Sequence, residues 1–286
     1  MIINAKVILL LANTVFLGIL SLFEYQFFQY ALLGGIISAI ATGLVGLFLI
    51  LRREAMIGDG IAHTAFGGIA LGLLLGINPL ITALFISVVA VFSISYMRKK
   101  GLAKSDAAIA VMLAVGFSTG LIIISIAGGF NIEIFSYLFG SILTITQVDL
   151  IIVSVLGIVS IIFFSFFKKE LLLITFDEDN AKITGIPVRF FSICFNLLVA
   201  FTIVLSIKVI GVILVVALMV LPALAALQLK RSFTGTMVAT LLCSSISVVG
   251  GILLSALYNV ATSGFIVFIA TSIFVGAAVG NRVFLS

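Results

Sequence analysis

Two ionisable residues lie four positions apart within an apolar stretch, and they are the first candidates for chemistry. They are Asp59 and His63, and His63 is the only histidine among 286 residues. On an α-helix, positions i and i+4 face the same side, about 6 Å apart along the axis. Imidazole and carboxylate together suit Zn²⁺, Mn²⁺ or iron as ligands, but not Cu⁺. The spacing therefore predicts a divalent metal site on one face of a helix.

Two ligands from one chain are too few for a stable metal site, whereas a twofold dimer would supply two nitrogens and two oxygens. If Arg53 lies at the inner interface, ten residues of helix raise His63 by about 15 Å, close to the middle of a hydrocarbon core about 30 Å thick. Two other interpretations stay open. The side chains of Asp59 and His63 could hydrogen-bond to each other or to backbone and only support packing, or they could relay protons.

The composition excludes a water-soluble protein. Hydrophobic residues make up 63% of the chain and charged residues 9%, with a mean hydropathy of +1.46. A soluble domain is about half apolar and a quarter charged. Apolar runs of 18 or more residues recur along the chain, which predicts an all-α, polytopic membrane helical bundle. No long polar segment interrupts them, so residues 1–286 are expected to form a single transmembrane domain.

About ten membrane spans are predicted, and eight or nine are also compatible with the pattern. The apolar runs lie near residues 5–23, 30–51, 57–76, 80–97, 106–127, 148–167, 190–207, 209–229, 233–257 and 262–283. Most Lys and Arg residues fall in alternate connections, which the positive-inside rule places in the cytoplasm together with both termini. This bias accounts for the net charge of +5 without nucleic acid as a partner. Residues 128–147 are expected to form a surface or re-entrant helix on the outer side.

The longest polar stretch predicts a short helix of about two turns on the cytoplasmic surface. Asp177 suits its N-cap, acidic residues follow in the first turn, Gly185 suits its C-terminal end, and Pro187 stops it. The stretch is either a solvated loop or a docking element for a cytoplasmic partner. The sequence has no Gly-x-x-x-x-Gly-Lys-Ser/Thr phosphate loop, so any ATP hydrolysis must come from another subunit.

Three stretches resemble the membrane permease subunit of the zinc/manganese ABC importers, the ABC-3 family. The first runs from Leu51 to Gly72 and contains Asp59 and His63; the others are residues 176–185 and 208–223. The resemblance covers residues 24–286, and residues 1–23 look like an extra N-terminal span.

The resemblance implies a permease of the type II ABC importer kind, which is not itself an enzyme. It implies a homodimer with a cytoplasmic ABC ATPase dimer and an extracellular metal-binding lipoprotein, in a prokaryotic plasma (inner) membrane. Residues matching Asp59 and His63 would line the metal path, and Asp177, Ala181 and Gly185 would belong to the helix that couples to the ATPase. The expected cargo is Zn²⁺, favoured, or Mn²⁺, with no permanently bound cofactor. Membrane lipids are the other expected partners.

Two other functions stay compatible with the sequence. A proton-coupled secondary transporter would use Asp59 and His63 as a relay and would need no ATPase. An ABC permease for a metal chelate would not require the pair at all. An intramembrane enzyme is disfavoured, because the sequence has one histidine, no HExxH motif and no convincing nucleophile–base pair.

Overall fold

The computed structural model describes residues 21–129, 132–141, 145–258 and 260–284, and all regular elements within these ranges are helices. They are α2 (Gln26–Leu51), α3 (Ala55–Leu75), α4 (Pro79–Lys99), α5 (Ser105–Ile126), α6 (Ile132–Phe139), α7 (Gln147–Phe166), α8 (Lys168–Phe176), α9 (Glu178–Ile183), α10 (Val188–Ile210), α11 (Val212–Gln228), α12 (Phe233–Tyr258) and α13 (Thr262–Phe284). Eight of these are long and apolar enough to cross a membrane. The predicted all-α membrane bundle is confirmed; the predicted span at 5–23 lies outside the described residues.

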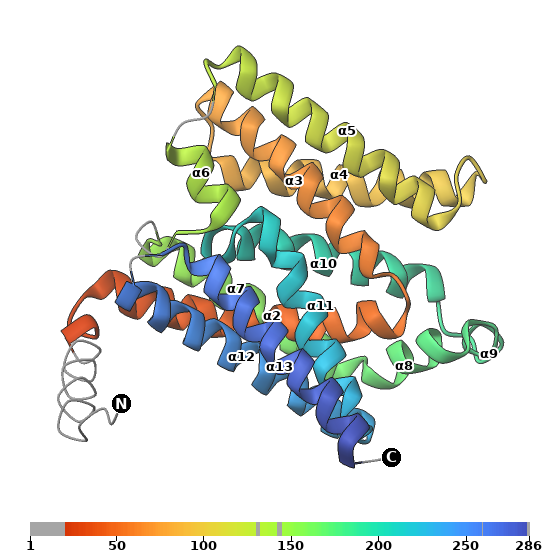
Figure 1. Ribbon diagram of the computed structural model, residues 1–286. Helices are drawn as coiled ribbons and strands as arrows, with labels where there is room; N and C mark the ends of the chain where they lie inside the picture. Colours follow the sequence, from red (N-terminus) through yellow and green to blue (C-terminus); the bar gives the residue numbers. More distant parts are fainter. Residues whose placement is uncertain (1–20, 130–131, 142–144, 259, 285–286) are drawn as a thin grey trace.

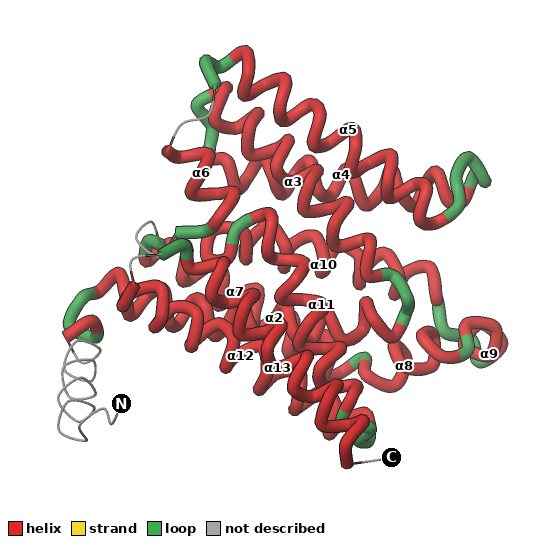
Figure 2. The backbone as a smooth tube through the Cα atoms, viewed as in Figure 1, coloured by secondary structure: helices red, strands yellow, loops and turns green. Residues whose placement is uncertain are grey.

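The helices form two packed groups (Figures 1 and 2). In one group, α3 packs against both α4 and α5. In the other, α2 packs against α7, α10, α11 and α12. Helices α10 and α11 also contact α3, so they join the two groups. Most of α2, α3 and α10 is buried, whereas less than a quarter of the α5, α7 and α13 spans is buried, as expected for helices that face lipid or a partner.

The charged residues gather at one end of the bundle, as the alternation of basic connections predicts. Arg52 follows α2, Arg98 ends α4, and Arg189 begins α10; all three line one cleft with Lys182 of α9. We call this the basic end; it lies on the right in Figure 1. The opposite end contains α6, the start of α7 and the turn between α10 and α11.

A single glycine divides α10 from α11 at the opposite end. Gly211 has φ 90°, and a Cβ there would lie 2.4 Å from the carbonyl oxygen of Leu138. Gly140 has φ 72°, and a Cβ there would lie 2.6 Å from the carbonyl oxygen of Val209. Only glycine fits either position, because both need a positive φ and a close backbone approach. The two glycines therefore fix α6 against the turn. The predicted span at 209–229 is α11, with 17 residues.

Small residues on α2 and α3 allow close helix packing. A Cβ at Gly46 would lie 2.0 Å from the carbonyl oxygen of Met219 on α11. Gly67 approaches the backbone of Gly116 on α5, and Gly68 approaches that of Ala83 on α4, with built Cβ distances of 2.6 Å in both cases. These contacts bring backbones together where lipid gives no hydrophobic drive for association.

We expect Gly46→Ala to lower the free energy of unfolding by about 1–3 kcal/mol, because α2 and α11 must move apart to admit one methyl group. Thermal unfolding in detergent measures the change. Gly276→Ala on α13 is the matched control, since a Cβ there meets nothing within 4 Å. Equal melting temperatures for the two variants would contradict the packing described above.

Candidate functional site

Asp59 and His63 lie on one face of α3, as their spacing predicts. Both residues are half-buried, and Met56, one turn earlier on the same face, is 51% exposed. The helix begins after Glu54 at the basic end, so the pair occupies its second and third turns. The described helices therefore leave part of this face uncovered.

The glycines on either side of Asp59 admit neighbouring helices. A Cβ at Gly60 would lie 2.7 Å from Cγ2 of Ile109 on α5. A Cβ at Gly58 would lie 3.7 Å from a methyl carbon of Val216 on α11, an ordinary contact. Helices α5 and α11 thus approach α3 on both sides of Asp59 and hold the backbone that presents its carboxylate.

His63 borders a cavity of about 180 Å³ between α3, α5, α6 and α11. Its ring meets the Phe117 ring edge-to-face, with centroids 5.1 Å apart. The other residues that line the cavity are all apolar: Phe66, Phe117, Leu121, Leu138, Val212 and Ile213. The Nδ1 atom of His63 is buried and has no hydrogen-bond partner in the structure. An unpaired buried ring nitrogen is costly, so it calls for a partner that the described chain lacks.

The donor set fits part of a metal site. Within the described ranges, no hydrogen bond or ion pair joins the side chains of Asp59 and His63. The described part of the chain contains no group of three or more His, Cys, Asp or Glu residues that could hold a metal ion. One chain thus offers one carboxylate and one imidazole, and a four-coordinate ion needs further ligands from elsewhere.

The predicted helix on the long polar connection is α9. Asp177 caps it by accepting a hydrogen bond from the backbone N–H of Asn180 at 2.9 Å, and Ala181 is completely buried. Gly185, with φ 82°, donates its N–H to the carbonyl of Lys182 at 3.1 Å, which with the neighbouring bond from Ile186 forms a Schellman motif. The N-cap at Asp177 and the glycine just past the C-terminus are confirmed. Helix α9 has six residues, slightly less than the two turns expected.

Helix α8 was not predicted. Residues 168–176 form a helix that leads directly into the Asp177 cap of α9. Leu171 and Ile174, three positions apart, are its buried residues and pack on the core. The spacing of these two residues is the signal that predicts the helix.

Glu54, which directly follows Arg52 and Arg53, was not predicted as a residue of the site. Its carboxylate lies 3.0 Å from Nε of Arg52 and 3.2 Å from Nη1 of Arg98. The guanidinium of Arg52 also lies 4.9 Å from the ring centroid of Phe195. Glu54 therefore joins the end of α2 to the end of α4 at the start of α3, the helix that carries Asp59 and His63.

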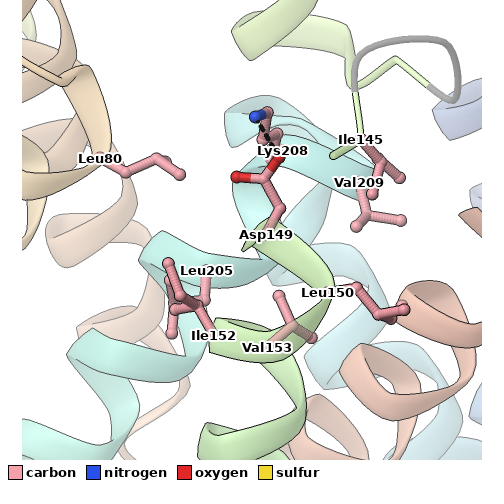
Figure 3. A pocket seen from close by; sticks show the side chains of 10 residues that line it. Leu80, Ile145, Asp149, Leu150, Ile152, Val153, Leu205, Lys208 and Val209 are labelled. Carbon is pink, nitrogen blue, oxygen red and sulfur yellow. Dashed lines mark hydrogen bonds and ion pairs between the residues drawn. The ribbon is translucent and has the colours of Figure 1, made fainter. Parts of the chain in front are cut away.

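A second unforeseen ion pair lies at the opposite end, between Asp149 of α7 and Lys208 of α10 (Figure 3). The two side chains are only 12% and 18% exposed. Asp149 also accepts a hydrogen bond from the backbone N–H of Thr146 at 2.8 Å, within a capping box. Asp149 is therefore paired within the chain.

Comparisons with known proteins agree with this architecture. The family model described as the ABC 3 transport family matches residues 24–281. The manganese transport system membrane protein MntC of Halalkalibacterium halodurans is 30% identical over 253 residues, which cover 88% of this chain and 87% of that protein. The high-affinity zinc uptake system membrane protein ZnuB of Haemophilus influenzae is 27% identical over 245 residues, which cover 86% and 94%.

A solved structure is also similar. A chain of PsaBC from Streptococcus pneumoniae in complex with Fab superposes with a TM-score of 0.82 and 31% identity, covering 91% of this chain and 94% of that one. The family match extends over most of the sequence, and the similar structure has the same helical fold. The chain therefore belongs to the ABC 3 transport family, as a membrane permease subunit and not an enzyme.

Proposed function

We propose that this chain is the transmembrane subunit of an ATP-driven importer of a divalent transition metal, in which the ion passes Asp59 and His63. The observation that carries the proposal is the half-buried carboxylate and imidazole on one face of α3, with the Nδ1 atom of His63 buried and unpaired. The relatives named for manganese and zinc support this class of cargo.

A second copy of the chain would complete the site. A twofold axis beside the partly uncovered face of α3 would bring two carboxylates and two imidazoles around one ion. Such a site near the middle of the membrane holds an ion less tightly than a structural zinc site, because the ion must leave it in every cycle. Asp59 and His63 bind and release the cargo in this proposal; they carry out no covalent chemistry.

The cargo is Mn²⁺ or Zn²⁺. The sequence alone favoured zinc, while MntC, named for manganese, is slightly more similar to this chain than ZnuB, named for zinc. Imidazole and carboxylate accept both ions, since selectivity depends on geometry and on the remaining ligands. We therefore include both ions, and a direct comparison of their uptake decides between them.

The partners follow from the two ends of the bundle. We assign the basic end to the cytoplasm of a prokaryotic cell by the positive-inside rule, with the ABC ATPase dimer docking at α9. An extracellular metal-binding lipoprotein would deliver the ion at the opposite end. Helix α13 fits this orientation, since it finishes at the basic end (Figure 1).

Uptake into proteoliposomes tests the proposal. The permease is reconstituted with its cognate ATPase and lipoprotein, and entry of radiolabelled Mn²⁺ and Zn²⁺ is measured. We expect uptake that requires ATP and survives a protonophore. Uptake that persists without the ATPase and collapses with the proton gradient would identify a secondary transporter. Uptake of a metal chelate but not of the free ion would identify a chelate permease.

We expect Gly185→Val to reduce ATP-dependent uptake several-fold and to reduce co-purification of the ATPase. Gly185 has φ 82° with open space around it, so a side chain strains the end of α9 by about 1–2 kcal/mol without a clash. Gly101→Val is the matched control, because Gly101 has φ 66°, the same open space, and a position in the turn after α4. If the two variants behave alike, α9 is not the coupling element.

A further inference from the structure

A cleft of about 690 Å³ opens at the basic end between the turn that joins α2 to α3, the end of α4, α9 and the start of α10. Its six basic side chains are Arg52, Arg98, Lys99, Lys100, Lys182 and Arg189. The cleft contains two carboxylates, those of Glu54 and Glu178, which leaves an excess of four positive charges. An anion is therefore the ligand that this cleft favours.

The carboxylates are already occupied within the protein. Glu54 pairs with Arg52 and Arg98, and Glu178 pairs with Lys182 at 2.9 Å. The positive charges of Lys99, Lys100 and Arg189 have no such partner in the described structure. All three are exposed at the mouth of the cleft, where they can meet an incoming phosphate.

Besides Oε2 of Glu54, which is ion-paired with Nε of Arg52, two buried polar atoms in the cleft lack hydrogen-bond partners among the described residues. They are Nη1 of Arg52, a donor, and Oδ1 of Asn196, an acceptor. Asn196 is only 7% exposed, so its unpaired oxygen is costly unless a ligand donates to it. A phosphate oxygen would satisfy the guanidinium, and a hydroxyl group would satisfy the amide oxygen. The pair of atoms matches a phosphodiester that carries a hydroxyl group.

An apolar stripe along α4 leads into the cleft. Ile81, Phe85, Val89, Phe92 and Tyr96 recur every three or four residues and are 44% to 66% exposed. Phe92 and Tyr96 also line the cleft itself. A soluble phosphate would use none of this surface, whereas an acyl chain would lie along it. The continuity of the stripe with the basic cleft favours a lipid.

We propose that this cleft binds the headgroup of an anionic phospholipid of the phosphatidylglycerol type, with its acyl chains along α4. The exposed basic side chains attract the phosphate, Arg52 donates to it, and Asn196 accepts from the glycerol hydroxyl. The bound lipid would occupy the space between α4 and α9, next to the helix proposed to couple to the ATPase.

Native mass spectrometry of the purified permease in detergent tests the proposal, with phosphatidylglycerol, phosphatidylcholine and glycerol 3-phosphate as probes. We expect retention of phosphatidylglycerol over phosphatidylcholine and no displacement by equimolar glycerol 3-phosphate. The double variant Lys100→Gln/Arg189→Gln should weaken phosphatidylglycerol binding roughly 25-fold, at about fivefold for each charge. Lys230→Gln/Arg231→Gln removes two exposed charges outside the cleft and should change the affinity for phosphatidylglycerol by no more than about twofold.

Asn196→Leu provides an independent variant. It should weaken phosphatidylglycerol more than phosphatidic acid, which lacks the glycerol hydroxyl. The proposal would be overturned if Lys100→Gln/Arg189→Gln and Lys230→Gln/Arg231→Gln lost phosphatidylglycerol binding equally. Full displacement of the lipid by glycerol 3-phosphate would also overturn it. So would loss of ATPase co-purification by Lys100→Gln/Arg189→Gln with lipid binding intact, since the cleft would then be a protein-docking surface.

Discussion

Replacing His63 with alanine, or Asp59 with asparagine, is expected to abolish uptake of both Mn²⁺ and Zn²⁺. In the proposed site each chain supplies one imidazole and one carboxylate, so either change removes two ligands from the dimer. Loss of the groups that hydrogen-bond to metal ligands lowers metal affinity or activity roughly 10- to 100-fold. Loss of the ligands themselves should therefore weaken metal binding by roughly 100-fold or more. The measurement is ATP-dependent uptake into proteoliposomes, normalised to reconstituted protein.

Asp106→Asn is the matched control for Asp59→Asn. Asp106 lies in the first turn of α5, near the same end of the bundle, and it is exposed. We expect it to transport like the wild type, because its carboxylate lies outside the proposed path. Size-exclusion profiles show whether each variant still folds. Normal uptake by well-folded His63→Ala and Asp59→Asn variants would show that the pair is structural.

Much of the fold could be predicted because membrane helices must satisfy their own backbone hydrogen bonds. An apolar run bounded by polar residues therefore becomes one helix, as in the span predicted at 233–257, which is α12 (Phe233–Tyr258). The same logic places Asp177 and Gly185 at the two ends of α9, since both act through backbone within a few residues. Because these signals lie within a few residues of one another, the sequence alone is enough to predict them.

Contacts between distant segments could not be predicted in the same way. Glu54 and Arg98 are 44 residues apart, and Asp149 and Lys208 are 59 apart, so their pairing depends on how the helices pack. The face shared by Asp59 and His63 is a helical property and could be predicted. The apolar cavity beside His63 could not, because it is built by residues of α5, α6 and α11.

Removing the ammonium group of Lys208 is expected to destabilise the permease by about 3 kcal/mol. Asp149 and Lys208 join α7 to α10 at the opposite end, and both side chains are more than four-fifths buried (Figure 3). In Lys208→Met, the buried carboxylate would retain only the hydrogen bonds from Thr146. An uncompensated buried charge is costly, while a matched pair contributes little net stability.

Adding Asp149→Asn to Lys208→Met should therefore restore most of the lost stability. The asparagine oxygen still accepts from the backbone N–H of Thr146, so the cap of α7 survives while the stranded charge disappears. Thermal unfolding of the two single variants and the double variant forms a double-mutant cycle that isolates the pair. Lys182→Met is the control: its partners Glu178 and Asp179 are exposed, so its loss should leave the melting temperature unchanged. A double variant no more stable than Lys208→Met would mean that the lysine acts through packing, and not by compensating Asp149.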